Sequence, residues 1–182
     1  MVLTKDELIG SLQHEVRVLL HLASKVDPAK LDYRPTAKQR SLLELLQYLT
    51  IAFPIHLRTI KSGAFDMDSW GTMWRTEGAT AKTLNLEQAK EAIGRQPALF
   101  EELLGSCSDA DLRAQMEMFG HKASRGLWIV RLVLSHYAAY RMQLFLYLKS
   151  CGREELSTMN LWGGMDAPQT KDMHAKQAVE KS

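Results

Sequence analysis

His136 and Tyr140 lie four residues apart in the segment Ser135–Gln143, inside the longest apolar stretch of the sequence. On a helix this spacing places both side chains on one face. Two histidines there would form half of a metal site, because neutral imidazole is a good zinc or nickel ligand at pH 7. A tyrosine phenol, whose ordinary pKa is ~10, must first lose a proton to bind a metal. The pair therefore predicts a polar interior site with altered metal chemistry.

The other histidines offer weaker candidates for chemistry. His56 could supply a further ligand if Pro54, two residues earlier, rotates the helix that carries it. A structural or surface role is the simpler interpretation for every one of them: His14, His21, His56, His121 and His174. The sequence contains no Ser-His-Asp order, no P-loop and no dinucleotide-binding glycine pattern, so the common hydrolase and nucleotide-binding sites are not indicated.

Arg141 is a charged residue in an otherwise apolar helix. A guanidinium in a protein core needs a partner, because an isolated buried charge costs several kcal/mol, on the order of 3–5. Glu15 and Glu44 are the candidate partners, and a structural ion pair is favoured over an anion-binding role. A modest basic cluster before and within the second helix is interpreted as a solvated face: Lys38, Arg40, Arg58 and Lys61.

The composition is that of an ordinary globular protein, with 182 residues, of which 46% are hydrophobic and 24% are charged. This length suits one domain of ~100–200 residues. The 23 Lys and Arg nearly balance the 21 Asp and Glu, which argues against nucleic-acid binding. The two cysteines follow no disulfide pattern, and the first residues turn polar at once, so we expect a cytoplasmic protein. Charged residues interrupt the apolar stretch 127–148, which argues against a membrane span.

The apolar periodicity predicts an all-α fold. Thr4 with Glu7 and Ser41 with Glu44 have the capping-box pattern that begins a helix. Leucine-rich stripes then define a first helix to about residue 26 and a second from 42 to about 61. A third begins at Asn85, with a break expected at 94–97, and a fourth runs over 124–150. No strands are expected, and 120–124 is predicted to be a loop. The result is a four-helix bundle with a long crossover connection over 63–84.

Two segments outside the four helices carry large apolar residues. Trp70 and Trp74 in the crossover would share a face if it is locally helical, and a lid on the bundle is favoured for them over a binding role. The segment 160–166 is expected to dock back on the bundle. These boundaries give a bundle domain over 1–166 and a polar tail over 167–182, which is expected to be disordered.

Several short matches, taken in order, carry a resemblance to a known family. They are Tyr33–Thr36 leading into Ser41–Leu46, then His136–Gln143, and the ending Leu148–Gly152. Over residues ~4–166 the chain resembles the DinB-like (DinB/YfiT) four-helix-bundle superfamily. Phe119-Gly120 and Asn160–Trp162 are similar to a bacterial branch of it that is usually left uncharacterised.

The resemblance implies a site as well as a fold. In metal-binding members, one histidine from the second helix and two from the fourth hold a divalent cation in the bundle interior. These positions fall on Tyr48, His136 and Tyr140, so only His136 is a ligand of the expected type. We therefore expect a non-catalytic or small-molecule-binding bundle without a cofactor. Because bundles of this superfamily often pair through their helices, the resemblance also implies a homodimer. The alternative is a metal-dependent thiol transferase or hydrolase that uses an altered divalent-metal or iron site.

Overall fold

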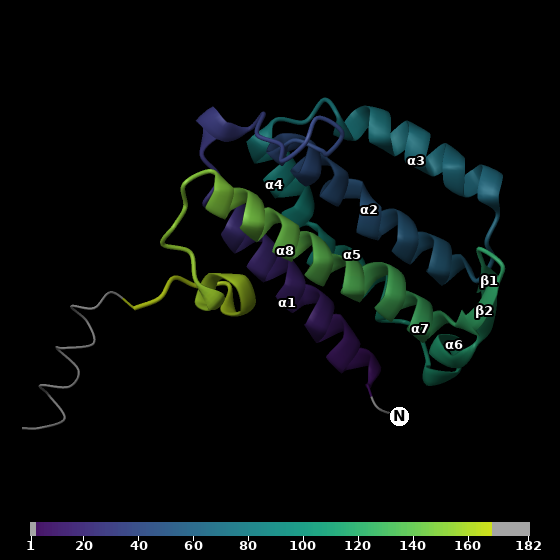
Figure 1. The fold of residues 1–182 in the computed structure, drawn as a ribbon. Coiled ribbons are helices and arrows are strands. Elements are labelled where there is room, and N and C mark those ends of the chain that lie inside the picture. Colours follow the sequence, from purple (N-terminus) through teal and green to yellow (C-terminus); the bar gives the residue numbers. More distant parts are fainter. Residues whose placement is uncertain (1–2, 169–182) are drawn as a thin grey trace, which may run out of the picture.

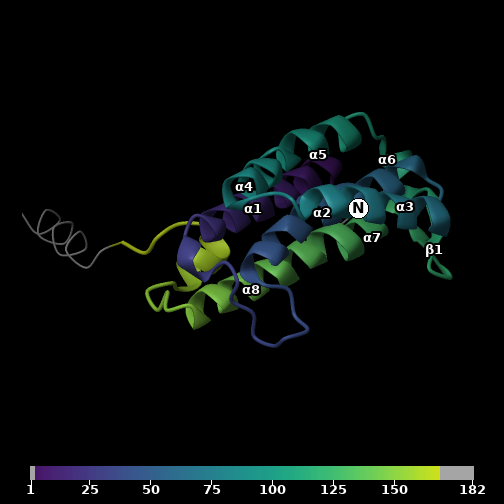
Figure 2. The same ribbon diagram turned by 90° about the horizontal axis from the view of Figure 1, so that it is seen from above.

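The computed structural model describes residues 3–168, and its long helices form a bundle. The first two are α1 (Lys5–Ala23) and α2 (Leu42–Ser62). The third is divided into α4 (Leu86–Gly94) and α5 (Gln96–Leu104), and the fourth consists mainly of α7 (Arg125–Ile129) and α8 (Ser135–Ser150). Figures 1 and 2 show α1 and α2 lying between α4–α5 on one side and α7–α8 on the other. The predicted all-α fold is confirmed.

Local sequence signals explain where the helices begin and end. The predicted capping boxes are present at Thr4–Glu7 and Ser41–Glu44, each with reciprocal hydrogen bonds between side chain and backbone amide. The third helix breaks between Gly94 and Gln96, as predicted. The leucine stripes of α1 and α2 are buried, and they form one core with residues from α4, α5 and α8. This core holds the inward faces of the helices in register for the site described below.

The crossover connection contains a helix of its own, α3 (Met67–Ala81), which starts at an Asp66 cap. It lies along α2 (Figure 1), so the condition for Trp70 and Trp74 to share a face is met. Arg58 on α2 pairs with Glu77 on α3 at 2.6 Å. Just beyond the end of α3, the buried Gln47 side-chain amide donates to the carbonyl oxygens of Lys82 and Leu84, at 3.2 and 2.7 Å. The C-terminal part of α3 is thus tied to α2 at two points.

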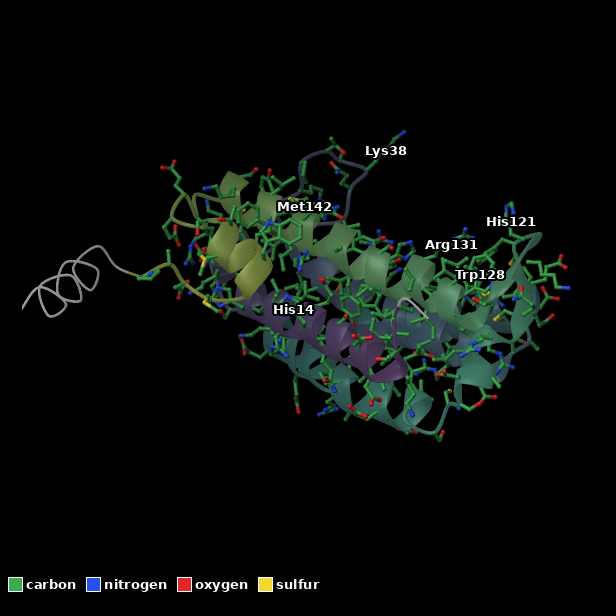
Figure 3. The ribbon with its side chains drawn as sticks, turned by 90° about the horizontal axis from the view of Figure 1, so that it is seen from below. His14, Lys38, His121, Trp128, Arg131 and Met142 are labelled. Carbon is green, nitrogen blue, oxygen red and sulfur yellow. The ribbon has the colours of Figure 1, made fainter. Side chains whose placement is uncertain are left out.

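The prediction of no strands was wrong for one short segment. After the small helix α6 (Asp109–Arg113), strands β1 (Gln115–Met118) and β2 (His121–Ser124) form an antiparallel hairpin. Both residues of its turn, Phe119 and Gly120, have positive φ, which is the backbone of a tight two-residue turn. Residues 120–124 are therefore mostly strand rather than loop. The labelled His121 extends outward from this hairpin, as Lys38 does from the loop before α2 (Figure 3).

The fourth helix also contains an irregularity that the sequence pattern did not predict. Residues Val130–Leu134, between α7 and α8, form a π-helical turn. A π-helical turn holds one more residue than an α-helical turn, so it changes the rotational phase of the residues on either side. The turn therefore sets the direction in which His136 and Tyr140 on α8 point.

The segment 160–166 docks on α1, as predicted. Asn160 bridges His21 at 3.0 Å and Asp166 at 2.9 Å, and Lys25 pairs with Asp166 at 2.6 Å. A side chain at Gly164, whose φ is +63°, would meet the Val18 Cα atom at 3.1 Å, so this position needs glycine. The predicted tail beyond it falls almost entirely outside the described residues. No helix within 3–168 has the length and apolar character to cross a membrane.

Candidate ligand site

Tyr48 from α2 and Tyr140 from α8 meet across the bundle, and we call them the phenol pair. The Tyr140 hydroxyl donates to the Tyr48 hydroxyl at 3.3 Å, and the ring centres lie 5.2 Å apart. Both side chains are half-buried. Of the three residues predicted from the resemblance, these two are brought into direct contact.

The third predicted residue, His136, lies closer to His56 than to Tyr140 of the phenol pair. Its ring centre is 5.8 Å from that of His56 on α2 and 6.3 Å from that of Tyr140. His56 is 6% exposed and lies two turns beyond Tyr48 on the same helix. Two imidazoles therefore lie next to each other between α2 and α8, at an angle of 64° between their rings.

Helix α3 closes the site with two indoles. The Trp74 ring lies 5.6 Å from His56 and stacks on Tyr48 at 5.7 Å, with an angle of 18° between the rings. Trp70 follows one turn earlier, 5.7 Å from Trp74 and 6.2 Å from His56. We refer to His56, Trp70, Trp74 and His136 as the imidazole–indole cluster.

Every member of the imidazole–indole cluster has a buried ring nitrogen without a hydrogen-bond partner among the residues that the structure describes. These atoms are Nδ1 of both histidines and Nε1 of both tryptophans. Folded proteins satisfy most buried polar groups, and an unsatisfied one costs on the order of 1–3 kcal/mol. Four such nitrogens in one place require an explanation that the packing of the fold does not provide.

Burial determines the protonation of the site. It lowers the pKa of His56 to about 4, with a smaller contribution from the charge of His136. It also lowers the pKa of His136. Burial raises the pKa of Tyr48 well above its ordinary value, and the hydrogen bond with Tyr140 raises it further. At pH 7 the site therefore presents neutral His56 and a protonated Tyr48.

The donors do not fit the three-histidine metal site that the resemblance implies. A catalytic zinc site uses three protein ligands of the imidazole, thiolate or carboxylate type. Within residues 3–168 no three His, Cys, Asp or Glu side chains gather closely enough to hold a metal ion. The phenol at Tyr48 stays protonated, because burial opposes the charged form, and a protonated phenol is a poor ligand.

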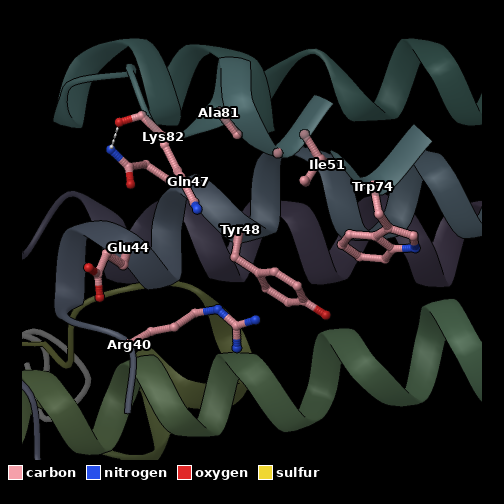
Figure 4. Close-up of a pocket in the computed structure, with 9 residues that line it drawn as sticks. Arg40, Glu44, Gln47, Tyr48, Ile51, Trp74, Ala81 and Lys82 are labelled. Atoms are coloured by element: carbon pink, nitrogen blue, oxygen red, sulfur yellow. Dashed lines mark hydrogen bonds between the residues drawn. The ribbon is translucent and has the colours of Figure 1, made fainter. Parts of the chain in front are cut away.

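A groove of about 490 Å³ borders the site (Figure 4). Tyr48 and Trp74 form part of its wall, so the groove and the imidazole–indole cluster share the Trp74 ring. We call it the Arg40 groove, and its lining residues are Arg40, Glu44, Gln47, Tyr48, Ile51, Trp74, Gly78, Ala81 and Lys82.

The basic residues singled out in the sequence do not form one cluster. Arg58 is paired with Glu77, and the Lys61 ammonium donates to the Cys107 thiol at 3.2 Å. Arg40 instead lies over the face of the Tyr48 ring, 3.9 Å from its centre. Interpreting all four residues as one solvated face was therefore wrong, because Lys38 and Arg40 precede α2 while Arg58 and Lys61 lie near its other end and are half-buried.

Comparison with known proteins identifies the fold. No family model matches the sequence, and no curated protein matches it. Among solved structures, the DinB-like protein YjoA from Bacillus subtilis superimposes with a TM-score of 0.63. The chain has the fold of a DinB-like protein. The match covers 83% of this chain and 95% of YjoA, at 18% sequence identity, which confirms the resemblance at the level of fold. YjoA is described only as DinB-like, so the likeness assigns no activity.

Sequence reasoning named Tyr48, His136 and Tyr140, and it offered His56 as a further ligand only if Pro54 rotates the helix. The four-residue spacing of Trp70 and Trp74 predicted a shared face, without placing that face against His56. What the sequence did not contain was the path of α3, which carries both indoles to His56. The sequence therefore contained the residues of this part of the site, but it gave no indication that they would lie together.

Proposed function

We propose that this protein binds a small organic molecule between α2, α3 and α8, at the phenol pair and the imidazole–indole cluster. The observation that carries the proposal is the set of four unpartnered ring nitrogens at one place. The indoles are hydrogen-bond donors, while each neutral imidazole Nδ1 is a donor or an acceptor according to its tautomer. A ligand with polar atoms on a flat apolar body would supply partners to these nitrogens and contact the surrounding rings.

The shape of the region supports the same proposal. Ligand sites are commonly concave and mostly apolar, with few polar groups, and their volumes are ~300–1,000 Å³. The Arg40 groove, at about 490 Å³, lies within this range and borders Trp74. Aromatic side chains provide large contact surfaces, and Trp74 is the member of the imidazole–indole cluster that lines the groove. The lid interpretation and the binding interpretation of these tryptophans are therefore compatible.

The experiment is an NMR screen of a small-molecule library, read from the indole N–H signals. Binders are expected to shift the Trp70 and Trp74 signals. Trp128 is an internal control, because its indole nitrogen already donates to the Met116 carbonyl at 3.2 Å. The signals are assigned with Trp70→Phe and Trp74→Phe variants. If no compound moves the Trp70 or Trp74 signals, or if Trp128 always moves equally, the proposal is wrong.

The proposal excludes a stoichiometric zinc or nickel ion as the centre of function, because the donors include too few ionised or imidazole ligands. We expect well under one equivalent of either metal in protein purified without an affinity tag and then incubated with the metal. Elemental analysis makes this measurement. About one equivalent that is lost in His136→Ala would contradict the expectation and favour the metal-dependent alternative.

A further inference from the structure

The Arg40 groove contains two cations that have no carboxylate partner among the described residues. Arg40 and Lys82 are both exposed, and neither takes part in an ion pair or donates a side-chain hydrogen bond within residues 3–168. In Figure 4 their side chains enter the groove from opposite edges, beside Tyr48. Two available positive charges at one end of an apolar groove favour an anionic group on the ligand.

Tyr48 holds the Arg40 guanidinium in a definite orientation. The guanidinium carbon lies over the ring, 3.9 Å from its centre, which is a cation–π contact. This contact leaves the edge of the guanidinium available, where its N–H groups match the two oxygens of a carboxylate. Arg40 is therefore oriented before any ligand arrives, and less side-chain entropy is lost when one binds.

The single carboxylate on the groove wall is already occupied. Glu44 contacts the Arg34 guanidinium at 3.3 Å and accepts the Ser41 backbone N–H at 2.7 Å. The Ser41 hydrogen bond is the main cause that lowers the pKa of Glu44; Arg34 adds to it, and the charge of Arg40 makes the smallest contribution, without an ion pair. Since Glu44 already has two partners, its charge does not neutralise both Arg40 and Lys82.

The opposite part of the groove is flat and apolar, and a glycine keeps it open. Gly78 lies within α3, where glycine costs ~1 kcal/mol relative to alanine. A Cβ atom there would meet only the Ile51 Cδ1 atom, at an ordinary contact distance of 3.8 Å. Packing therefore does not require glycine at this position. Its absent side chain leaves space between Ile51 and Trp74, next to the Tyr48–Trp74 stack, for the body of a planar ligand.

We propose that the ligand is a small aromatic carboxylic acid, with its carboxylate between Arg40 and Lys82 and its ring against Trp74 beside Gly78. This inference rests on the proposed function, because Tyr48 and Trp74 belong to both the groove and the site above. It adds the chemical class of the ligand and the residues that select it.

Calorimetric titration with indole-3-acetate and its neutral carboxamide tests the inference. The two probes share a ring system and differ in charge. We expect the wild-type protein to bind the carboxylate at least ~10-fold more tightly than the carboxamide, which corresponds to ~1.4 kcal/mol. The double variant Arg40→Gln/Lys82→Gln should reduce this preference to ~3-fold or less. Lys38→Gln, an exposed charge on the same loop as Arg40, is the matched control and should retain the preference.

Gly78→Leu provides a second, steric test. The leucine should fill the groove and abolish binding of both probes, and circular dichroism should show that the helices persist. Equal binding of the two probes to the wild-type protein would overturn the inference and leave the proposed function standing. A carboxylate preference that survives in the Arg40/Lys82 double variant would overturn it as well. If neither probe binds at millimolar concentration, the ligand class is wrong, and the NMR screen alone decides the proposed function.

Discussion

At the scale of single residues, some polar groups in the bundle interior are paired with an opposite charge and others have no partner among the described residues. The Arg141 guanidinium contacts both carboxylate oxygens of Glu15, at 3.1 and 3.0 Å, and lies over the Trp162 ring. Glu15 is thus the partner among the two candidates, while Glu44 pairs with Arg34. The charges of Glu15 and Arg141 are thus matched, although Glu15 Oε2 and Arg141 Nε make no hydrogen bond within residues 3–168. The four ring nitrogens of the imidazole–indole cluster have neither a hydrogen bond nor an ion pair within these residues.

The Glu15–Arg141 pair is expected to affect stability mainly because removal of one residue leaves the charge of the other buried and unpaired. Arg141→Met leaves a buried carboxylate alone and should lower the free energy of unfolding by about 3–5 kcal/mol. Glu15→Gln/Arg141→Met removes both charges and should cost clearly less. Urea denaturation of the three proteins measures the difference. Equal losses in the single and double variants would contradict this account of the pair.

His56 should make the protein less stable in mild acid. Its pKa is about 4 in the folded protein, because of burial, and ~6.5 in an unfolded chain. Above pH ~6.5 the residue is neutral in both states. As the pH falls from ~6.5 towards 4, only the unfolded state takes up the proton, so stability is lost, by a difference on the order of 3 kcal/mol.

This dependence is measured as the free energy of unfolding of the wild type minus that of His56→Gln at each pH. The subtraction removes the contributions of other titrating groups that the variant leaves unchanged. A difference that stays constant between pH 7 and 4 would show that His56 is not held neutral by its surroundings.

At the scale of helices and strands, local signals predicted the long elements and missed those that depend on neighbours. The capping boxes and leucine stripes act within a few residues, so α1, α2 and the break between α4 and α5 were readable. The hairpin was overlooked although Gln115–Met118 alternates exposed and buried residues, because four residues are too few to decide a period. The path of α3 follows from contacts with α2 that no local pattern encodes.

Gln47 is the residue that fixes the end of α3, and its loss should loosen that helix. Gln47→Leu removes two buried hydrogen bonds to the Lys82 and Leu84 carbonyl oxygens. We expect a loss of about 1–3 kcal/mol in stability. Hydrogen exchange should also become faster at the amides of α3 than at those of α1. Gln39→Leu, at an exposed position in the loop before α2, is the control. Uniformly faster exchange in all helices would instead indicate a general loss of stability.

At the scale of the whole molecule, α8 leaves an apolar strip on the outside of the bundle. Met142 and Leu146 lie one turn apart and are 37% and 54% exposed, and Figure 3 shows Met142 on this outer side. Adjoining exposed apolar residues indicate an interaction surface when the patch that they form exceeds a few hundred Å². A second copy of the chain could cover the strip in a symmetric arrangement, in which both copies use the same surface.

We therefore expect a homodimer that depends on this strip. Light scattering at micromolar concentration should give about twice the chain mass of 20.6 kDa. Leu146→Glu should shift the protein towards the monomer by placing charge in the interface. Met159→Glu, which changes another exposed apolar residue on the C-terminal segment, should leave the mass unchanged. A wild-type protein of single-chain mass across the concentration range would rule out this expectation.

The π-helical turn at Val130–Leu134 has a consequence for how such a site changes during evolution. Each added residue rotates an α-helix by about 100°, so an insertion that is not absorbed locally would turn everything beyond it away from the core. Here the wide turn absorbs the extra residue, and Trp128 before it and Tyr137 after it are both buried. The direction in which the side chains of α8 point is therefore set independently of the direction of those in α7. The packing around Trp128 is kept by α7, while the inward-facing residues of α8 can change chemistry without disturbing it.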